Sequence, residues 1–289
     1  MIPATFDYVA AGSVADATAF LAAHPDEAKI VAGGHSLIPL MKLRLAQPKY
    51  LVDISRIPGL REIKEVNGAL EIGALATHHD IESSSIVRER LPILAETAAT
   101  IGDVQVRNRG TLGGVLAHSD PAADYPAAIL ALGAEITAVG PSGQRTIKAT
   151  DFFVDLLTTS LKSNELITSI RIPIPAAGTG AAYVKFPHPA SRYAITGIAA
   201  VVQLGAGGKV ASAAIGVTGA GSKAIRASAA EAGLVGGALD DAALQKAGSA
   251  AAEAIDPIGD IHASEEYRRH LVRELTGRAL RAAAARAKA

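Results

Sequence analysis

Two double glycines constrain this chain more than any other feature, Gly33-Gly34 near the N-terminus and Gly113-Gly114 much later in the sequence. Each pair lies beside a stretch with strand character and is followed by residues able to begin a helix or a turn. Because glycine has no Cβ, bare N–H groups at such a turn can converge on the anionic oxygens of a ligand. The two pairs are far enough apart in sequence to form opposite walls of one cleft. The pattern predicts a cleft that holds a diphosphate-bearing cofactor from both sides.

Composition narrows the class of protein. The 289 residues are 49% apolar and 19% charged, enough to bury a substantial core in one large domain or two to three smaller ones. The 28 basic and 28 acidic residues give a formal net charge of zero, so no long-range field favours nucleic acid or an anionic membrane. Without cysteine the chain has no disulfide, thiolate nucleophile, iron–sulfur ligand or zinc–thiolate site, which fits a cytosolic protein.

The chain carries no visible targeting or spanning segment. The first seven residues, MIPATFD, lack a basic region followed by an apolar one, so we expect no secretory signal. No run approaches 18 uninterrupted apolar residues, so we expect no transmembrane helix.

The first quarter of the chain predicts a small α/β lobe. Ser13 and Asp16 form a capping-box pattern for a helix that ends near His24. Residues 29–32 are expected as a strand that leads into the first double glycine. Ser36 is expected to cap a helix over 37–43, and residues 50–53 to form the next strand.

The middle of the chain is richer in predicted strands. Asn67-Gly68 between residues 63–66 and 69–72 is typical of a two-residue β-hairpin, because Asn and Gly accept positive φ at low cost. Helices are expected at 91–100 and around 126–132. A further strand pair is expected on either side of 140–143.

A segment rich in proline and glycine at 172–178 predicts a connection between domains. Beyond it we expect a hairpin of 199–204 with 210–217, and helices at 222–232, 240–255 and 264–287. The predicted fold is α+β: a two-lobed domain over 1–176, with lobes 1–56 and 57–176, then a smaller α+β domain over 177–289 with a short antiparallel sheet and helices.

The glycine segments match neither the Rossmann fingerprint nor a P-loop. Residues 32–42 (AGGHSLIPLMK) instead resemble the first flavin-binding signature of the FAD-carrying medium subunits of molybdenum hydroxylases. Residues 107–114 (RNRGTLGG), followed by 117–124 (AHSDPAAD), are similar to the second signature. The pattern is most similar to the medium subunits of aerobic, molybdenum-dependent carbon monoxide dehydrogenases, and xanthine dehydrogenase has the same fold as its flavin domain. The resemblance covers nearly the whole chain and implies the two-lobed FAD-binding domain and the C-terminal domain described above.

The resemblance implies a set of FAD contacts and no catalytic or metal-ligating residue in this chain. The first loop and the second would cradle the diphosphate, while Asp124 would contact the nucleotide part and Lys185 and Tyr193 would lie near the isoalloxazine. The implied contacts are Ala32, Gly33, Gly34, His35, Ser36, Leu37, Thr111, Leu112, Gly113, Gly114, Val115, Asp124, Ile167, Lys185 and Tyr193.

Four of these positions also have ordinary structural interpretations, which the sequence leaves open. Asp124 would equally serve as a helix N-cap before Pro126, and Ile167 as a core strand residue. Lysines such as Lys185 are usually solvated, and Tyr193 would fit strand-edge packing.

One position departs from the family pattern. Relatives usually have Asn or Ser after the second double glycine, whereas this chain has Val115. A side-chain donor to phosphate or ribose is therefore absent, which predicts weaker retention of FAD, by about 1 kcal/mol, but not its loss.

Other polar clusters predict no separate site. His78 and His79 are adjacent, so a regular element cannot turn both toward one metal, and a structural or solvated role is expected. His118 and Asp120 lack a nucleophile elbow and are expected to shape the loop beside FAD. The six arginines of the last helix are expected on a solvated face: Arg268, Arg269, Arg273, Arg278, Arg281 and Arg286.

The resemblance implies an oxidoreductase subunit that transfers electrons. A large subunit would carry the molybdenum cofactor, and a small subunit two [2Fe–2S] clusters that this cysteine-free chain cannot ligate. The complex is expected to be a cytoplasmic dimer of heterotrimers that passes electrons to an external acceptor, with attachment to the inner face of the membrane left open. Carbon monoxide is the leading substrate. N-heterocycles or aldehydes, and more remotely a self-contained flavin oxidoreductase or a flavin-free binding module, remain alternatives.

Overall fold

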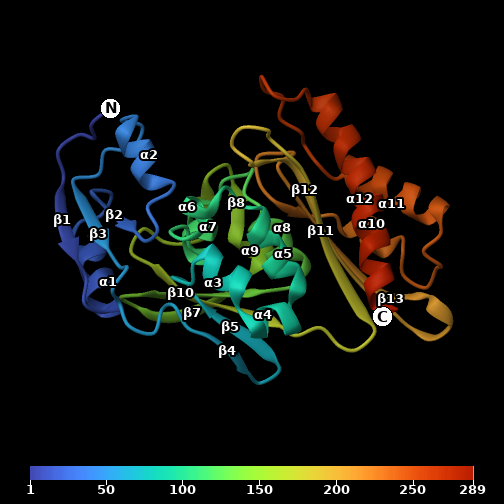
Figure 1. Cartoon of the computed structure of the whole chain (residues 1–289). Coiled ribbons are helices and arrows are strands. Elements are labelled where there is room, and N and C mark those ends of the chain that lie inside the picture. The colour runs from blue at the N-terminus through green and yellow to red at the C-terminus, as the bar shows by residue number, and fades with distance from the viewer. Residues whose placement is uncertain (289) are drawn as a thin grey trace.

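The chain folds into three main sheets that follow one another across the molecule. The computed structural model describes residues 1–288. In Figure 1 the N-terminal sheet lies at the left in blue, the middle sheet at the centre, and the C-terminal sheet at the right beside the long red helix. No helix of this described part is both long and apolar enough to cross a bilayer.

The N-terminal sheet has three parallel strands in the order β1-β3-β2, joined by two helices. Its elements are β1 (Asp7–Ala10), α1 (Val14–Ala23), β2 (Ala28–Val31), α2 (Leu37–Lys42) and β3 (Tyr50–Asp53). The Ser13 hydroxyl accepts a hydrogen bond from the Asp16 N–H at 3.0 Å, so the predicted helix start is confirmed. The predicted cap at Ser36 is wrong, because Ser36 is itself in the α conformation and makes no side-chain capping bond.

The N-terminal sheet does not have a core of its own. Its hydrophobic cluster joins Leu21, Val52 and Ile54 to Leu75 and Leu166, which belong to the middle of the chain. The three-stranded sheet is therefore stabilised by packing against its neighbour, in keeping with how little apolar surface so small a unit can bury alone.

The middle sheet is antiparallel, in the order β4-β5-β10-β6-β7. Its strands are β4 (Ile63–Val66), β5 (Ala69–Gly73), β6 (Glu135–Gly140), β7 (Gly143–Lys148) and β10 (Leu166–Pro173). Asn67 and Gly68 have φ of 49° and 72°, which confirms the predicted hairpin. A short pair, β8 (Phe153–Asp155) with β9 (Thr158–Thr159), lies beside this sheet.

Helices from the middle of the chain cover one face of this sheet. They are α3 (His78–Ser83), α4 (Ser85–Arg90), α5 (Pro92–Thr100), α6 (Val104–Arg107), α7 (Leu112–His118), α8 (Tyr125–Ala131) and α9 (Ala149–Phe152). Leu94, Leu116 and Ile129 of these helices are fully buried with Ile72 and Ile170 of the strands, in the largest core of the molecule. The opposite face carries polar side chains that include Glu71, Thr137, Thr146 and Arg171.

The C-terminal sheet is antiparallel, in the order β11-β12-β13-β14. The chain here consists of β11 (Thr179–Pro187), β12 (Ala194–Leu204), the short 3₁₀ helix η1 (Ala206–Gly208), β13 (Val210–Thr218), β14 (Ile225–Arg226), α10 (Ser228–Ala232), α11 (Asp241–Glu253) and α12 (Glu265–Ala287). Helix α10 begins at Ser228, six residues later than the predicted start at 222, because the intervening strand β14 pairs with β13.

The C-terminal sheet has helices on both faces. Ile198 and Val202 of β12 face the cluster that contains α12, whereas Ala199 between them faces the core that contains α8. This alternation follows the two-residue period of a strand. The α+β fold predicted from the sequence is therefore confirmed, and the C-terminal sheet packs directly on a helix of the middle region.

Arg268 corrects the predicted solvated face of α12. Its guanidinium is buried and donates to the carbonyl oxygens of Ile195 and Gly219 and to the Asp260 carboxylate. Arg268 therefore links α12 to the start of β12 and to the end of β13, a role that its position in the helical pattern did not indicate.

Candidate functional site

A cavity of about 640 Å³ lies where the N-terminal sheet, the middle region and the loop after β11 meet. This volume is within the range of cavities that bind cofactors. All the site residues expected from the sequence line it except Leu112 and Lys185. Leu112 is fully buried in the core, and Lys185 lies behind Asp124.

The two double-glycine segments contact each other at Gly33. A Cβ built at Gly33 would overlap the carbonyl oxygen of Arg109, which is backbone and has no rotamer to move into. The absence of a Cβ at Gly33 thus allows the two loops to pack against each other. It is not needed in order to expose N–H groups to a ligand, which was the reason predicted from the sequence. The sequence interpretation of the glycines is incomplete in this respect.

The first loop presents free backbone donors. Among the described residues, none accepts a hydrogen bond from the N–H groups of residues 33–36, all of which line the cavity. Four neighbouring N–H groups without a protein partner at the start of α2 form the kind of concave donor set that binds anionic oxygens. This observation supports the predicted diphosphate site.

The second loop differs, because the N–H groups of residues 112–115 already have acceptors. Leu112 and Gly113 donate to the carbonyl oxygens of Ala76 and Ala74, and Gly114 donates to the Thr111 hydroxyl oxygen at 3.2 Å. Thr111 is the N-cap of α7, and its own O–H remains available as a donor. The second loop therefore lines the cavity with backbone atoms and with the Thr111 hydroxyl as a donor. It does not add a second set of free N–H groups like that of residues 33–36.

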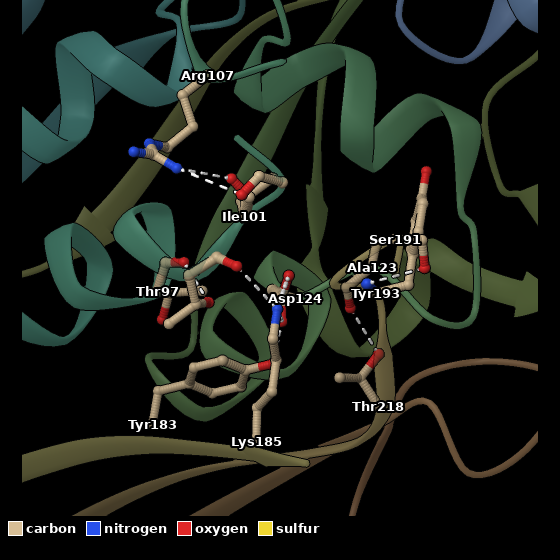
Figure 2. Close-up of polar contacts among 12 residues, drawn as sticks. Thr97, Ile101, Arg107, Ala123, Asp124, Tyr183, Lys185, Ser191, Tyr193 and Thr218 are labelled. Atoms are coloured by element: carbon tan, nitrogen blue, oxygen red, sulfur yellow. Dashed lines mark hydrogen bonds and ion pairs between the residues drawn. The ribbon is translucent and has the colours of Figure 1, made fainter. Parts of the chain in front are cut away.

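Asp124 does not cap α8, so the alternative interpretation of this residue as a helix N-cap is wrong. Although it stands at the N-cap position, its carboxylate makes no capping bond. It accepts hydrogen bonds from the Tyr183 hydroxyl at 2.5 Å and from the Lys185 ammonium at 3.0 Å (Figure 2). Asp124 is buried and lines the cavity, so its carboxylate is held as an acceptor at the cavity wall.

The loop after β11 forms the wall nearest solvent. Tyr193 lines the cavity, and the residue is 44% exposed. Its N–H donates to the Ser191 hydroxyl oxygen at 3.4 Å, as Figure 2 shows, while Arg192 before it has a φ of 63°. Burial raises the pKa of the Tyr193 hydroxyl, so this group remains a donor at neutral pH. An aromatic ring in this position can stack on a planar ligand.

His78 is a cavity residue that the sequence interpretation assigned no part in the site. The residue is 2% exposed, and its ring packs against Tyr125 and has no hydrogen-bond partner at Nδ1 within the described chain. Burial lowers its pKa to about 4, so the imidazole is neutral at physiological pH. Its backbone N–H bonds the carbonyl of Gly110, a link to the second loop that no local sequence signal indicates.

Comparison with known proteins defines the class. Residues 4–175 match the family described as the FAD binding domain in molybdopterin dehydrogenase, and residues 181–283 match the CO dehydrogenase flavoprotein C-terminal domain. The chain therefore belongs to the FAD-binding medium subunits of the molybdenum hydroxylases and is an oxidoreductase subunit. The free amides of residues 33–36 suit a diphosphate, and the volume of the cavity is large enough for a cofactor such as FAD.

Individual relatives extend over the full chain. The carbon monoxide dehydrogenase medium chain of Hydrogenophaga pseudoflava is 43% identical, with 99% of each chain covered. The 6-hydroxypseudooxynicotine dehydrogenase complex subunit alpha of Paenarthrobacter nicotinovorans is 42% identical, covering 100% of this chain and 97% of the relative.

Solved structures give the same result. Carbon monoxide dehydrogenase from Hydrogenophaga pseudoflava, in a form that lacks the Mo-pyranopterin moiety of its cofactor, superposes with a TM-score of 0.97 at 45% identity over 99% of each chain. Quinoline 2-oxidoreductase from Pseudomonas putida 86 gives 0.94 at 34% identity over 100% of each chain.

Proposed function

We propose that this chain is the FAD-carrying electron-transfer subunit of a heterotrimeric molybdenum hydroxylase. It would take electrons from the [2Fe–2S] clusters of a small partner subunit and pass them to an external acceptor, while a large subunit holds the molybdenum cofactor and oxidises the substrate. Two heterotrimers would form the complete complex. The absence of cysteine supports this division, since the chain cannot hold the clusters itself.

One observation carries the proposal: the cavity that the two glycine segments enclose has free amides on one side and an ionisable, buried acceptor on the other. Residues 33–36 would hold the diphosphate, Thr111 would donate a hydrogen bond to a phosphate oxygen, and Asp124 would accept one from a hydroxyl group of the cofactor. Ile167 would supply apolar contact and Tyr193 would cover the ring system. When bound, FAD supplies the redox chemistry, and the chain fixes its position and its access to solvent.

We also propose the division of the chain into an FAD-binding domain over 1–176 and a C-terminal domain over 177–289. The separate family matches to residues 4–175 and 181–283 support it. We expect a cytoplasmic location for the complex.

Carbon monoxide is the leading substrate of the whole complex, because a carbon monoxide dehydrogenase medium chain is 43% identical to this chain. The second candidate is a dehydrogenase of N-heterocyclic or aldehyde substrates. The nicotine-related relative at 42% and a glyceraldehyde dehydrogenase medium chain at 37% favour it.

The test is substrate-driven bleaching of the flavin absorbance under anaerobic conditions. The chain is purified alone and in the complex that co-purifies from its native host, with metal and flavin analysis of both. Bleaching by carbon monoxide in the complex only would support the proposal, and bleaching by an N-heterocycle or aldehyde instead would favour the second candidate. Bleaching of the isolated chain would indicate a self-contained oxidoreductase, and a complex without flavin would refute the proposal.

A further inference from the structure

Asp124 is the centre of a buried polar network that joins two parts of the fold. The Tyr183 hydroxyl and the Lys185 ammonium, both on β11, donate to its carboxylate, and Lys185 also donates to the carbonyl oxygen of Thr100 at the end of α5 at 3.0 Å. The side chains of Asp124 and Lys185 are each 5% exposed. Figure 2 shows Tyr183 and Lys185 rising from the strand toward Asp124.

The strand geometry explains how both donors reach one carboxylate. Tyr183 and Lys185 are two residues apart, so their side chains lie on the same face of β11. That face is directed at the core of the middle region, which contains Tyr183 as a packing neighbour. Only Asp124 of the three lines the FAD cavity.

The C-terminal sheet also holds the backbone that carries Asp124. The Thr218 hydroxyl donates to the carbonyl oxygens of Pro121 and Ala123 at 2.8 and 2.7 Å. The Ala194 N–H donates to the carbonyl oxygen of Ala122 at 3.0 Å. The segment before Asp124 is therefore fixed by strand ends of the C-terminal sheet.

Gly197 on β12 leaves room for the tyrosine. A Cβ built at Gly197 would overlap the Tyr183 hydroxyl oxygen. The neighbouring strand thus lacks a side chain at the one place where it would push this hydroxyl away from Asp124.

We propose that Tyr183 and Lys185 are positioning residues that hold the Asp124 carboxylate as a hydrogen-bond acceptor at the FAD cavity, without touching the cofactor themselves. The inference deepens the proposed function and rests on FAD occupying this cavity. It assigns a part to Tyr183 that the sequence did not suggest, and it changes the part expected of Lys185 from a flavin contact to a support for Asp124.

The charges explain why the support is needed. Burial raises the pKa of the Asp124 carboxyl, while the Lys185 ammonium and the Tyr183 hydroxyl act in the opposite direction. Burial also raises the pKa of Tyr183 well above its usual value, so its hydroxyl remains a donor. Without Lys185 the carboxyl would take up a proton at a higher pH and would lose its capacity as a charged acceptor.

A double-mutant cycle on FAD affinity tests the proposal. FAD dissociation constants of the full chain are measured by flavin fluorescence quenching for the wild type, Lys185→Met, Asp124→Asn and the double variant, from mildly acidic to mildly alkaline pH. We expect Lys185→Met to weaken FAD binding about tenfold and to make it weaken further as the pH falls. In the Asp124→Asn background the same change should cost less than about threefold and show no pH dependence.

A second cycle keeps the test decisive if Lys185→Met does not fold. Tyr183→Phe in the wild-type and Asp124→Asn backgrounds should show the same dependence on Asp124. Lys209→Met and Tyr267→Phe repeat the two substitutions at exposed positions and should leave FAD affinity unchanged.

Equal losses in the two backgrounds would overturn the inference, because they would mean that Lys185 or Tyr183 acts on FAD directly or only through overall stability. A wild-type chain that does not bind FAD would instead refute the proposed function itself.

Discussion

Replacing Gly33 by alanine tests the contact between the two glycine segments most directly. The new Cβ would overlap the carbonyl oxygen of Arg109, and backbone atoms of Arg109 and Gly110 lie within 3 Å of it. Because no side chain can rotate away, the loops must separate. Overpacking of this kind typically costs about 1–3 kcal/mol, and the backbone partner places this site near the upper end, at about 3 kcal/mol.

The same separation would displace the free amides of residues 33–36. Losing one hydrogen bond to a charged phosphate oxygen costs about 1.5–3 kcal/mol, so we expect FAD affinity to fall by about tenfold or more. Urea denaturation of the FAD-free chain measures the first effect, and fluorescence titration with FAD the second.

Gly237→Ala is the matched control, since Gly237 is exposed and its built Cβ is no closer than 3.5 Å to any neighbour. It should change the free energy of unfolding by no more than about 0.5 kcal/mol. If Gly33→Ala matched this control in both assays, the two segments would not be in contact as described, and the basis of the diphosphate site would fail.

Three further predictions concern single side chains. Val115→Asn should restore a donor at the cavity wall and slow FAD release about fivefold, equivalent to about 1 kcal/mol, in a stopped-flow displacement assay; unchanged or faster release would count against it. The pKa of His78 is 6.5 in the unfolded chain and about 4 in the folded chain, so the unfolded chain takes up this proton first as the pH falls. The free energy of unfolding should therefore decrease by roughly 3 kcal/mol between pH 6.5 and pH 4. His78→Gln should remove that part of the acid slope in urea titrations, and a wild-type slope would contradict the assignment. Arg268→Met should lower the free energy of unfolding by about 3 kcal/mol, since it strips the donor from buried carbonyls and Asp260, whereas exposed Arg273→Met should have little effect; equal results for both would refute the role of Arg268.

The sequence correctly predicted turns and helix starts that depend only on neighbouring residues. Asn67-Gly68 specifies a hairpin because the turn needs positive φ, and Ser264 precedes a long helix whose N-terminus it caps through the Tyr267 N–H. Ser36 failed as a cap because it is itself in the α conformation, and it lines the cavity instead.

Features that depend on distant partners could not be predicted in this way. Arg268 resembles the solvated arginines of its helix, and only the folded strands bring the carbonyls of Ile195 and Gly219 to it. The short strand β14 interrupts a segment of helical composition because β13 offers an unpaired edge. The pattern of the glycines indicated a ligand site, but it did not indicate that the first loop packs against the backbone of the second. The structure shows that Gly33 is needed for this contact.

The core that the N-terminal sheet shares with the middle region has a consequence for the stability of the first lobe. Leu75 and Leu166 complete that core and also line the cavity, so a flavin bound there would contact side chains that hold the first lobe in place. A ligand that binds only the folded form raises stability in proportion to the logarithm of its free concentration. We therefore expect bound FAD to protect the first lobe against proteolysis, and to do so more strongly as its free concentration rises.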